Sequence, residues 1–188
     1  ADFPAYTMRV VEQMEGGTCL FASGTAGDIV PINRDIRPRE RIGKALGGEV
    51  LRGLQFAPTS GDVTLSAMKK TIKFPLKEPP ASGETVQVDK SPDYLITEIQ
   101  VLRIGDICIL GLPGEILVEV GLEIKRRAAL KNLFIVTLCN DSIGYVCHEE
   151  AYDEGGYEPG TGTNLARGAG ETMVNEALDL IHQMKANP

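Results

Sequence analysis

The carboxylate of Glu115 stands between two strongly patterned segments. Residues 107–112 form a short apolar, β-branched run bounded by turn-forming dipeptides, which predicts a central strand. From residue 116 apolar side chains recur at helical spacing, and the basic residues at 125–127 suit the far end of a helix dipole. In open α/β sheets ligands bind beyond the carboxyl ends of strands, which is where Glu115 would lie. The same position also suits a carboxylate that only complements the helix N-terminus, so both interpretations stay open here.

Polar side chains also follow the other predicted strands. Residues 18–23 and 133–139 are apolar runs that predict further buried strands, each followed by an irregular segment. If these strands share one sheet, the segments converge at one of its edges. They would gather Asp28, Asn33, Glu115, Asn140, Tyr145, Glu149, Glu150, Tyr152 and Tyr157. Carboxylates with phenols favour a metal site or acid–base chemistry, although the same set could form an ordinary polar rim.

Histidines are scarce, which limits what this chain can catalyse alone. A hydrolytic zinc site usually takes three protein ligands, at least one of them a histidine, and leaves one position open for water. His182 is expected at the surface of a terminal helix, and His148 as a partly buried, hydrogen-bonded side chain. The sequence has no Gly-x-Ser-x-Gly nucleophile elbow, and residues 24–27 lack the features of a phosphate-binding loop. The residues of this chain therefore do not complete a catalytic site.

Composition is that of an ordinary globular protein. The chain has 188 residues, of which 43% are hydrophobic and 24% charged, and its net charge of −7 argues against a nucleic-acid partner. No apolar segment reaches the length of a membrane span. The four cysteines show no CxxC spacing, so buried free thiols are expected, and a Cys139–Cys147 bridge is not favoured.

The remaining pattern predicts an α/β fold with a mixed β-sheet core flanked by helices. Helices are expected at residues 4–15, 38–56 and 168–185, and the glycines of the second helix call for close packing against a neighbour. Period-two alternation predicts half-buried antiparallel strands at 62–76 and 96–104. The alternating residues are Val63, Leu65 and Ala67, later Ile72 and Phe74, and then Ile99, Val101 and Ile104. Residues 77–93, rich in proline and glycine, predict a surface excursion. No domain boundary is evident, so residues 1–188 are expected to be a single domain or part of one.

Several motifs in order resemble the second half of the catalytic domain of neutral/alkaline non-lysosomal ceramidases. They are Asp2-Phe-Pro4, the stretch from Leu20 to Asn33, Gly111-Leu-Pro-Gly-Glu115, Asn140 through Tyr152, and Tyr157-Glu158. The resemblance implies a zinc centre that hydrolyses the amide bond of N-acylated sphingosine. Two histidine ligands would come from the first half of the domain, and the other two ligands would be Glu115 and Tyr152 of this chain. Asp28, Asn33 and Asn140 would line the catalytic site.

The resemblance also sets expectations for the whole protein. The chain is expected to be the C-terminal portion of a ceramidase-like catalytic domain, with the missing N-terminal half of the same protein as its partner and a small-molecule or lipid substrate. Secretion or a periplasmic location is expected. Val30 stands where the family carries a serine, so water is favoured as the nucleophile. A further tyrosine of the family is replaced by Asn164 or lost to a gap. The predicted function is zinc-dependent hydrolysis of an amide or related bond; the alternative is a catalytically inactive member that binds a lipid or glycan-like ligand.

Overall fold

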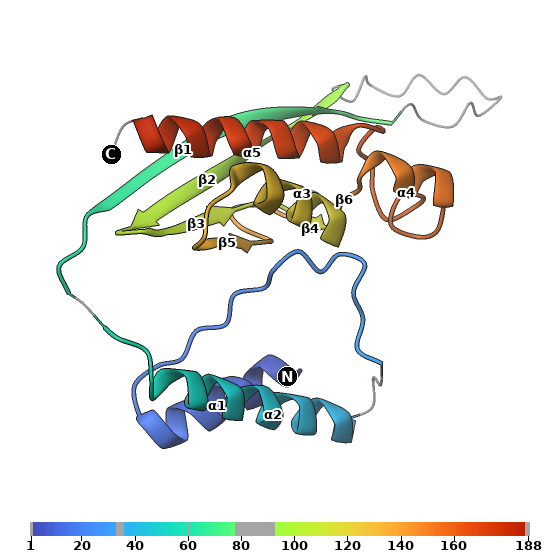
Figure 1. Cartoon of the computed structure of the whole chain (residues 1–188). Coiled ribbons are helices and arrows are strands. Elements are labelled where there is room, and N and C mark those ends of the chain that lie inside the picture. Colours follow the sequence, from blue (N-terminus) through green and yellow to red (C-terminus); the bar gives the residue numbers. More distant parts are fainter. Residues whose placement is uncertain (1, 33–35, 60, 78–92, 187–188) are drawn as a thin grey trace. The chain divides into compact units, whose positions relative to one another are not determined.

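The computed structural model describes residues 2–32, 36–59, 61–77 and 93–186 (Figure 1). The chain divides into two compact units. Ala1–Ala22 and Val30–Asp62 form a helical unit, and Ser23–Ile29 and Val63–Pro188 form a sheet unit. The expectation of one domain over residues 1–188 stays a prediction. Most of the predicted excursion at 77–93 lies outside the described residues.

The helical unit consists of α1 (Phe3–Glu15) and α2 (Ile36–Leu54), which confirms both predicted helices. Asp2 caps α1, since its Oδ1 accepts a hydrogen bond from the Phe3 amide at 2.7 Å. A Cβ added to Gly43 would come within 2.5 Å of the Tyr6 Cβ of α1, so this glycine is needed for close approach of the two helices. The packing expected from the glycines of α2 is thus confirmed at Gly43.

The predicted strand at residues 18–23 is wrong. These residues form no strand and are exposed, apart from a partly exposed Cys19. The Cys19 amide donates to Glu12 Oε1 at 2.9 Å, which is a side-chain contact and not a ladder hydrogen bond. The Ser23 carbonyl at the end of the run accepts from the Thr137 amide at 2.9 Å, but residues 18–22 join no strand ladder. All four cysteines are free, with Cys108 and Cys147 buried.

The sheet unit is built on a mixed four-stranded sheet, as predicted. Its strand order is β1 (Leu65–Pro75), β2 (Tyr94–Ile104), β3 (Ile107–Gly111) and β5 (Leu133–Val136). The first three strands pair antiparallel, while β3 and β5 pair parallel. The predicted central strand is therefore confirmed. β5 ends three residues earlier than expected because Leu138 and Asn140 have positive φ angles of 56° and 65°, which turn the chain out of the strand.

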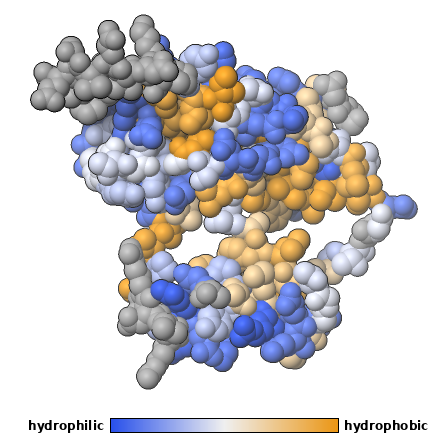
Figure 2. Space-filling view, turned by 180° about the vertical axis from the view of Figure 1, so that it is seen from behind, coloured by the Kyte–Doolittle hydropathy of each residue, from blue (hydrophilic) through white to orange (hydrophobic). Residues whose placement is uncertain are grey.

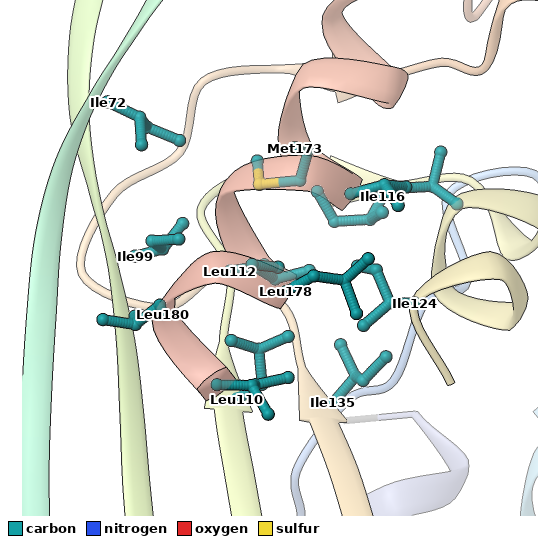
Figure 3. Packing of buried hydrophobic residues seen from close by; sticks show 14 of the residues in the cluster. Ile72, Ile99, Leu110, Leu112, Ile116, Ile124, Ile135, Met173, Leu178 and Leu180 are labelled. Carbon is teal, nitrogen blue, oxygen red and sulfur yellow. The ribbon is translucent and has the colours of Figure 1, made fainter. Parts of the chain in front are cut away.

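Helices cover one face of this sheet. They are α3 (Val118–Ala128) and α5 (Ala169–Ala186), and the short α4 (Glu149–Glu154) lies beyond the N-terminal end of α5 (Figure 1). The core between helices and sheet contains Ile99, Leu110, Ile124, Met173 and Leu180 (Figure 3). All five apolar residues on which the last helix was predicted to pack are buried, namely Met173, Ala177, Leu180, Ile181 and Met184.

The opposite face of the sheet carries apolar side chains at the surface. Of the residues in the predicted alternation, Leu65, Ala67 and Ile104 are exposed, whereas Ile72, Phe74, Ile99 and Val101 are buried. Seven residues separate Leu65 from Ile72, and an odd separation places two side chains on opposite faces of a regular strand. Phe134, 57% exposed, belongs to the same outer face. Figure 2 shows such hydrophobic surface on the sheet unit. None of the described helices is long and apolar enough to cross a membrane.

Candidate functional site

Glu115 lies in a second, smaller sheet. β4 (Glu115–Ile116) pairs parallel with β6 (Tyr145–Val146), so that Glu115 is opposite Tyr145. The predicted start of the helix at residue 116 is wrong, because the helix cap is Leu117 and the first helical residue is Val118. Glu115 is therefore a strand residue, two positions before the helix cap. The turn before it is confirmed, with Gly114 at a φ of +82°.

Glu115, Tyr145 and Tyr157 form a carboxylate–phenol cluster. The Tyr145 side chain lies beside the Glu115 carboxylate, because the two residues are directly opposite each other in the paired strands. Burial first, and then the Glu115 contact, raise the pKa of Tyr145 above its usual value. The ring of Tyr157 meets the ring of Tyr145 edge to face, with centroids 5.8 Å apart. Residues 30 positions apart in the chain thus present a carboxylate and a phenol side by side.

Tyr152 has a different set of contacts. Its hydroxyl, on α4, donates to the backbone carbonyls of Leu165 at 3.2 Å and Ala166 at 3.4 Å. Burial raises the pKa of this phenol to about 12. The Lys77 ammonium lies 5.7 Å from the centre of its ring. The assignment of Tyr152 as a metal ligand stays a prediction, but the phenol that contacts Glu115 belongs to Tyr145.

The loop Ser23–Ile29 holds Asp28 beside the strand that carries Glu115. The Gly27 amide donates to the Ile116 carbonyl at 2.9 Å, and Asp28 Oδ1 accepts from the Val118 amide at 3.0 Å. Asp28 therefore supplies the first turn of α3 with a hydrogen-bond acceptor. The predicted convergence holds for Asp28 and Glu115, although the Asp28 oxygen is engaged by the backbone.

The structure describes one of the two asparagines that were predicted to line the site. Asn33 lies outside the described residues. Asn140 is exposed, and its Nδ2 donates to Gln100 Oε1 on β2 at 3.1 Å. Its neighbour Asp141 was not predicted, yet the Asp141 carbonyl accepts from the Gly114 amide at 3.3 Å and so holds the turn before Glu115.

A cavity of about 870 Å³ opens between α3, α4 and α5. Of the predicted polar residues it is lined by Asp28 and Glu150. His148 also lines it and is partly buried, as expected, but its Nδ1 is buried with no hydrogen-bond partner among the described residues. His182 is exposed on α5, which confirms its surface position. The carboxylates that α3 and α5 add to this cavity were missed, because their helical spacing is that of a solvated face.

Within the described part of the chain, no group of three or more histidine, cysteine, aspartate or glutamate side chains is arranged to hold a metal ion. Glu115 and Tyr145 offer two neighbouring oxygen donors. Catalytic zinc commonly has three protein ligands. The described residues thus fit a part of such a coordination shell.

Solved structures of ceramidases share this fold. The chain superimposes on a neutral ceramidase from Pseudomonas aeruginosa with a TM-score of 0.74 and 18% identity, over 99% of this chain and 41% of that one. A ceramidase complexed with C2 gives a TM-score of 0.73 at 16% identity, over 99% and 42% of the two chains. No protein-family model and no curated protein matches the sequence.

The chain therefore has the fold of part of a neutral ceramidase, which confirms the resemblance and the α/β class at the level of the fold. It spans about two fifths of the length of the ceramidases that it matches.

Proposed function

We propose that this chain is part of a zinc-dependent, ceramidase-like hydrolase that cleaves an amide or related bond. The observation that carries the proposal is the pairing of Glu115 with Tyr145 on β4 and β6, within a fold shared with neutral ceramidases. Glu115 and Tyr145 would be the ligands that this chain contributes. Histidine ligands would come from residues outside the chain.

The surroundings of the pair suit this role. The Glu115 carboxylate is exposed, whereas the backbone on either side of it is held by Gly27, Asp141 and Gly144 through hydrogen bonds of 2.9 to 3.3 Å. The carboxylate is thus fixed at its base and exposed at its tip, as a metal ligand must be. Tyr145 is oriented by Glu115 and by the ring of Tyr157.

Zinc at this position would polarise a scissile carbonyl and lower the pKa of a bound water. The chain's own residues would position the reactants around it. Tyr157 has an exposed side chain beside Tyr145, so its phenol is available to donate a hydrogen bond to a substrate oxygen. Val30 offers no hydroxyl, which leaves water as the nucleophile.

The test is zinc content and hydrolysis in the protein expressed from its full gene. Elemental analysis should find about one zinc per chain, and Glu115→Gln and Tyr145→Phe should each weaken zinc binding by at least about tenfold. Tyr94→Phe is the matched control, because it removes a phenol from β2 whose ring contacts Lys73. Equal zinc affinity in all four proteins would refute the proposed ligands.

Hydrolysis of a panel of N-acyl amines separates the two function classes. Release of free amine by the wild type, lost in Glu115→Gln, supports the hydrolase. Zinc bound without turnover of any panel member would instead favour a binding protein on the same scaffold.

A further inference from the structure

The cavity between α3, α4 and α5 is separate from the proposed zinc ligands. Its volume of about 870 Å³ lies within the range of small-molecule pockets, roughly 300–1,000 Å³. Its described lining residues do not include Glu115, Tyr145 or Tyr157. All of them belong to the sheet unit, so one compact body shapes its walls.

The lining is strongly acidic. It contains seven carboxylates, those of Asp28 and six glutamates, against the two guanidinium groups of Arg126 and Arg127. Arg126 is held by Glu123 through hydrogen bonds of 2.8 and 2.7 Å, and Arg127 donates to Asn175 Oδ1 at 3.1 Å. A concave surface with an excess of one charge attracts ligands of the opposite sign. The cavity therefore favours a cation.

Two buried polar atoms at the junction of α4 and α5 have no hydrogen-bond partner among the described residues. Glu171 Oε1 accepts from the Glu149 amide at 2.9 Å, but its Oε2 is buried without a hydrogen-bond partner among the described residues. His148 Nδ1 is in the same condition. The two residues are brought together by Gly170, where an added Cβ would come within 2.9 Å of the His148 Cα. Buried polar atoms are normally paired, so a ligand with several N–H donors fits this junction.

The floor of the cavity is apolar. Leu117, Val120, Ala151 and Val174 line it, and each is at most 5% exposed. A metal ion or a small inorganic cation would make no apolar contact with these floor residues. A ligand that joins an ammonium group to a hydrocarbon chain would use both the acceptors and the floor.

We propose that this cavity binds a protonated alkyl amine, with its ammonium group at Glu171 and His148 and its hydrocarbon chain over the apolar floor. Binding of this kind involves none of the proposed zinc ligands. It therefore goes beyond the hydrolase proposal and can fail or succeed independently of it.

The experiment is calorimetric titration of the chain with hexylammonium, hexanol and hexanoate, which share one hydrocarbon length. Saturable binding is expected for hexylammonium, with hexanol and hexanoate weaker by at least about tenfold. Glu171→Gln should lower the hexylammonium affinity by at least about tenfold. Asp179→Asn is the matched control, since it removes one negative charge from the same helix outside the described cavity lining.

A second variant keeps the proposal testable if Glu171→Gln fails to fold. Val174→Phe fills the apolar floor without changing charge and should also abolish binding, with circular dichroism confirming the helices. Equal affinity for hexanol and hexylammonium would overturn the proposal, because it would leave the carboxylates without a role. So would hexylammonium binding that survives both Glu171→Gln and Val174→Phe.

Discussion

Replacing Gly27 by alanine should loosen the loop that supports Glu115. A Cβ at position 27 would lie 2.9 Å from the Glu115 carbonyl oxygen and 3.0 Å from the backbone of Ile116. These are backbone atoms of a paired strand, so they cannot move aside as a side chain can. The loop must shift instead, which breaks the hydrogen bond from the Gly27 amide to the Ile116 carbonyl.

The expected cost follows from the contacts that the shift removes. A backbone hydrogen bond contributes about 1 kcal/mol to the free energy of unfolding. The acceptor that Asp28 gives to the Val118 amide, 3.0 Å away, contributes a further amount of about 1 kcal/mol. We therefore expect Gly27→Ala to lower the stability of the sheet unit by about 2 kcal/mol, which moves its urea midpoint down by about 1 M.

The assay is urea unfolding followed by circular dichroism, with amide hydrogen exchange at Val118 as the local probe. Gly24→Ala is the matched control in the same loop, because its added Cβ would lie 3.9 Å from the nearest atom, the Ile135 carbonyl oxygen. That variant should stay within about 0.5 kcal/mol of the wild type. An unchanged midpoint and unchanged Val118 protection in Gly27→Ala would show that the loop does not hold the strand as described.

Three further predictions concern other contacts. Lys77→Met removes three hydrogen bonds of 2.6 to 2.9 Å from the ammonium to carbonyls of residues 159–163, so hydrogen exchange in that segment should become faster; unchanged exchange would contradict the role of the lysine. Burial raises the pKa of Tyr152 from 10.0 to about 12, so its contribution to stability is complete below pH 10 and is lost as the pH rises through about 12. Urea midpoints should therefore fall less steeply over that range in Tyr152→Phe, and equal slopes would contradict this. In α2, Gly48→Ala, with open space around the added Cβ, should raise the helical unit's stability by up to about 1 kcal/mol, whereas Gly43→Ala should lower it; the same sign of shift in both melting temperatures would refute the packing argument.

Much of the fold follows from local pattern. The alternation in residues 62–76 and the helical spacing of the last helix predicted real elements, since burial on one face selects these periods directly. The errors came where the outcome depends on a distant partner. Residues 18–23 have the composition of a strand, yet they do not pair along the free edge of β5, and only the Ser23 carbonyl is bonded near it.

For the candidate site, too, the local features could be predicted and the contacts between distant segments could not. The turn before Glu115 and the exposure of its carboxylate follow from the local sequence Pro-Gly-Glu. Which phenol meets Glu115 depends on the parallel pairing of β4 with β6, and no local pattern sets that register. Tyr152 and Tyr145 belong to the same segment of the chain. Only the fold determines that the Tyr152 hydroxyl donates to backbone carbonyls, while the Tyr145 phenol lies beside the Glu115 carboxylate.

By itself, then, the sequence determined the kinds of element, the α/β class, the position of Glu115 after a central strand and the resemblance to ceramidases. The tertiary structure decided the pairing of Glu115 with Tyr145, the use of Asp28 at the start of α3, and the acidic cavity between three helices. The physical reason is that propensity and burial act over a few neighbouring residues, whereas a site is assembled by contacts between segments that only the folded chain brings together.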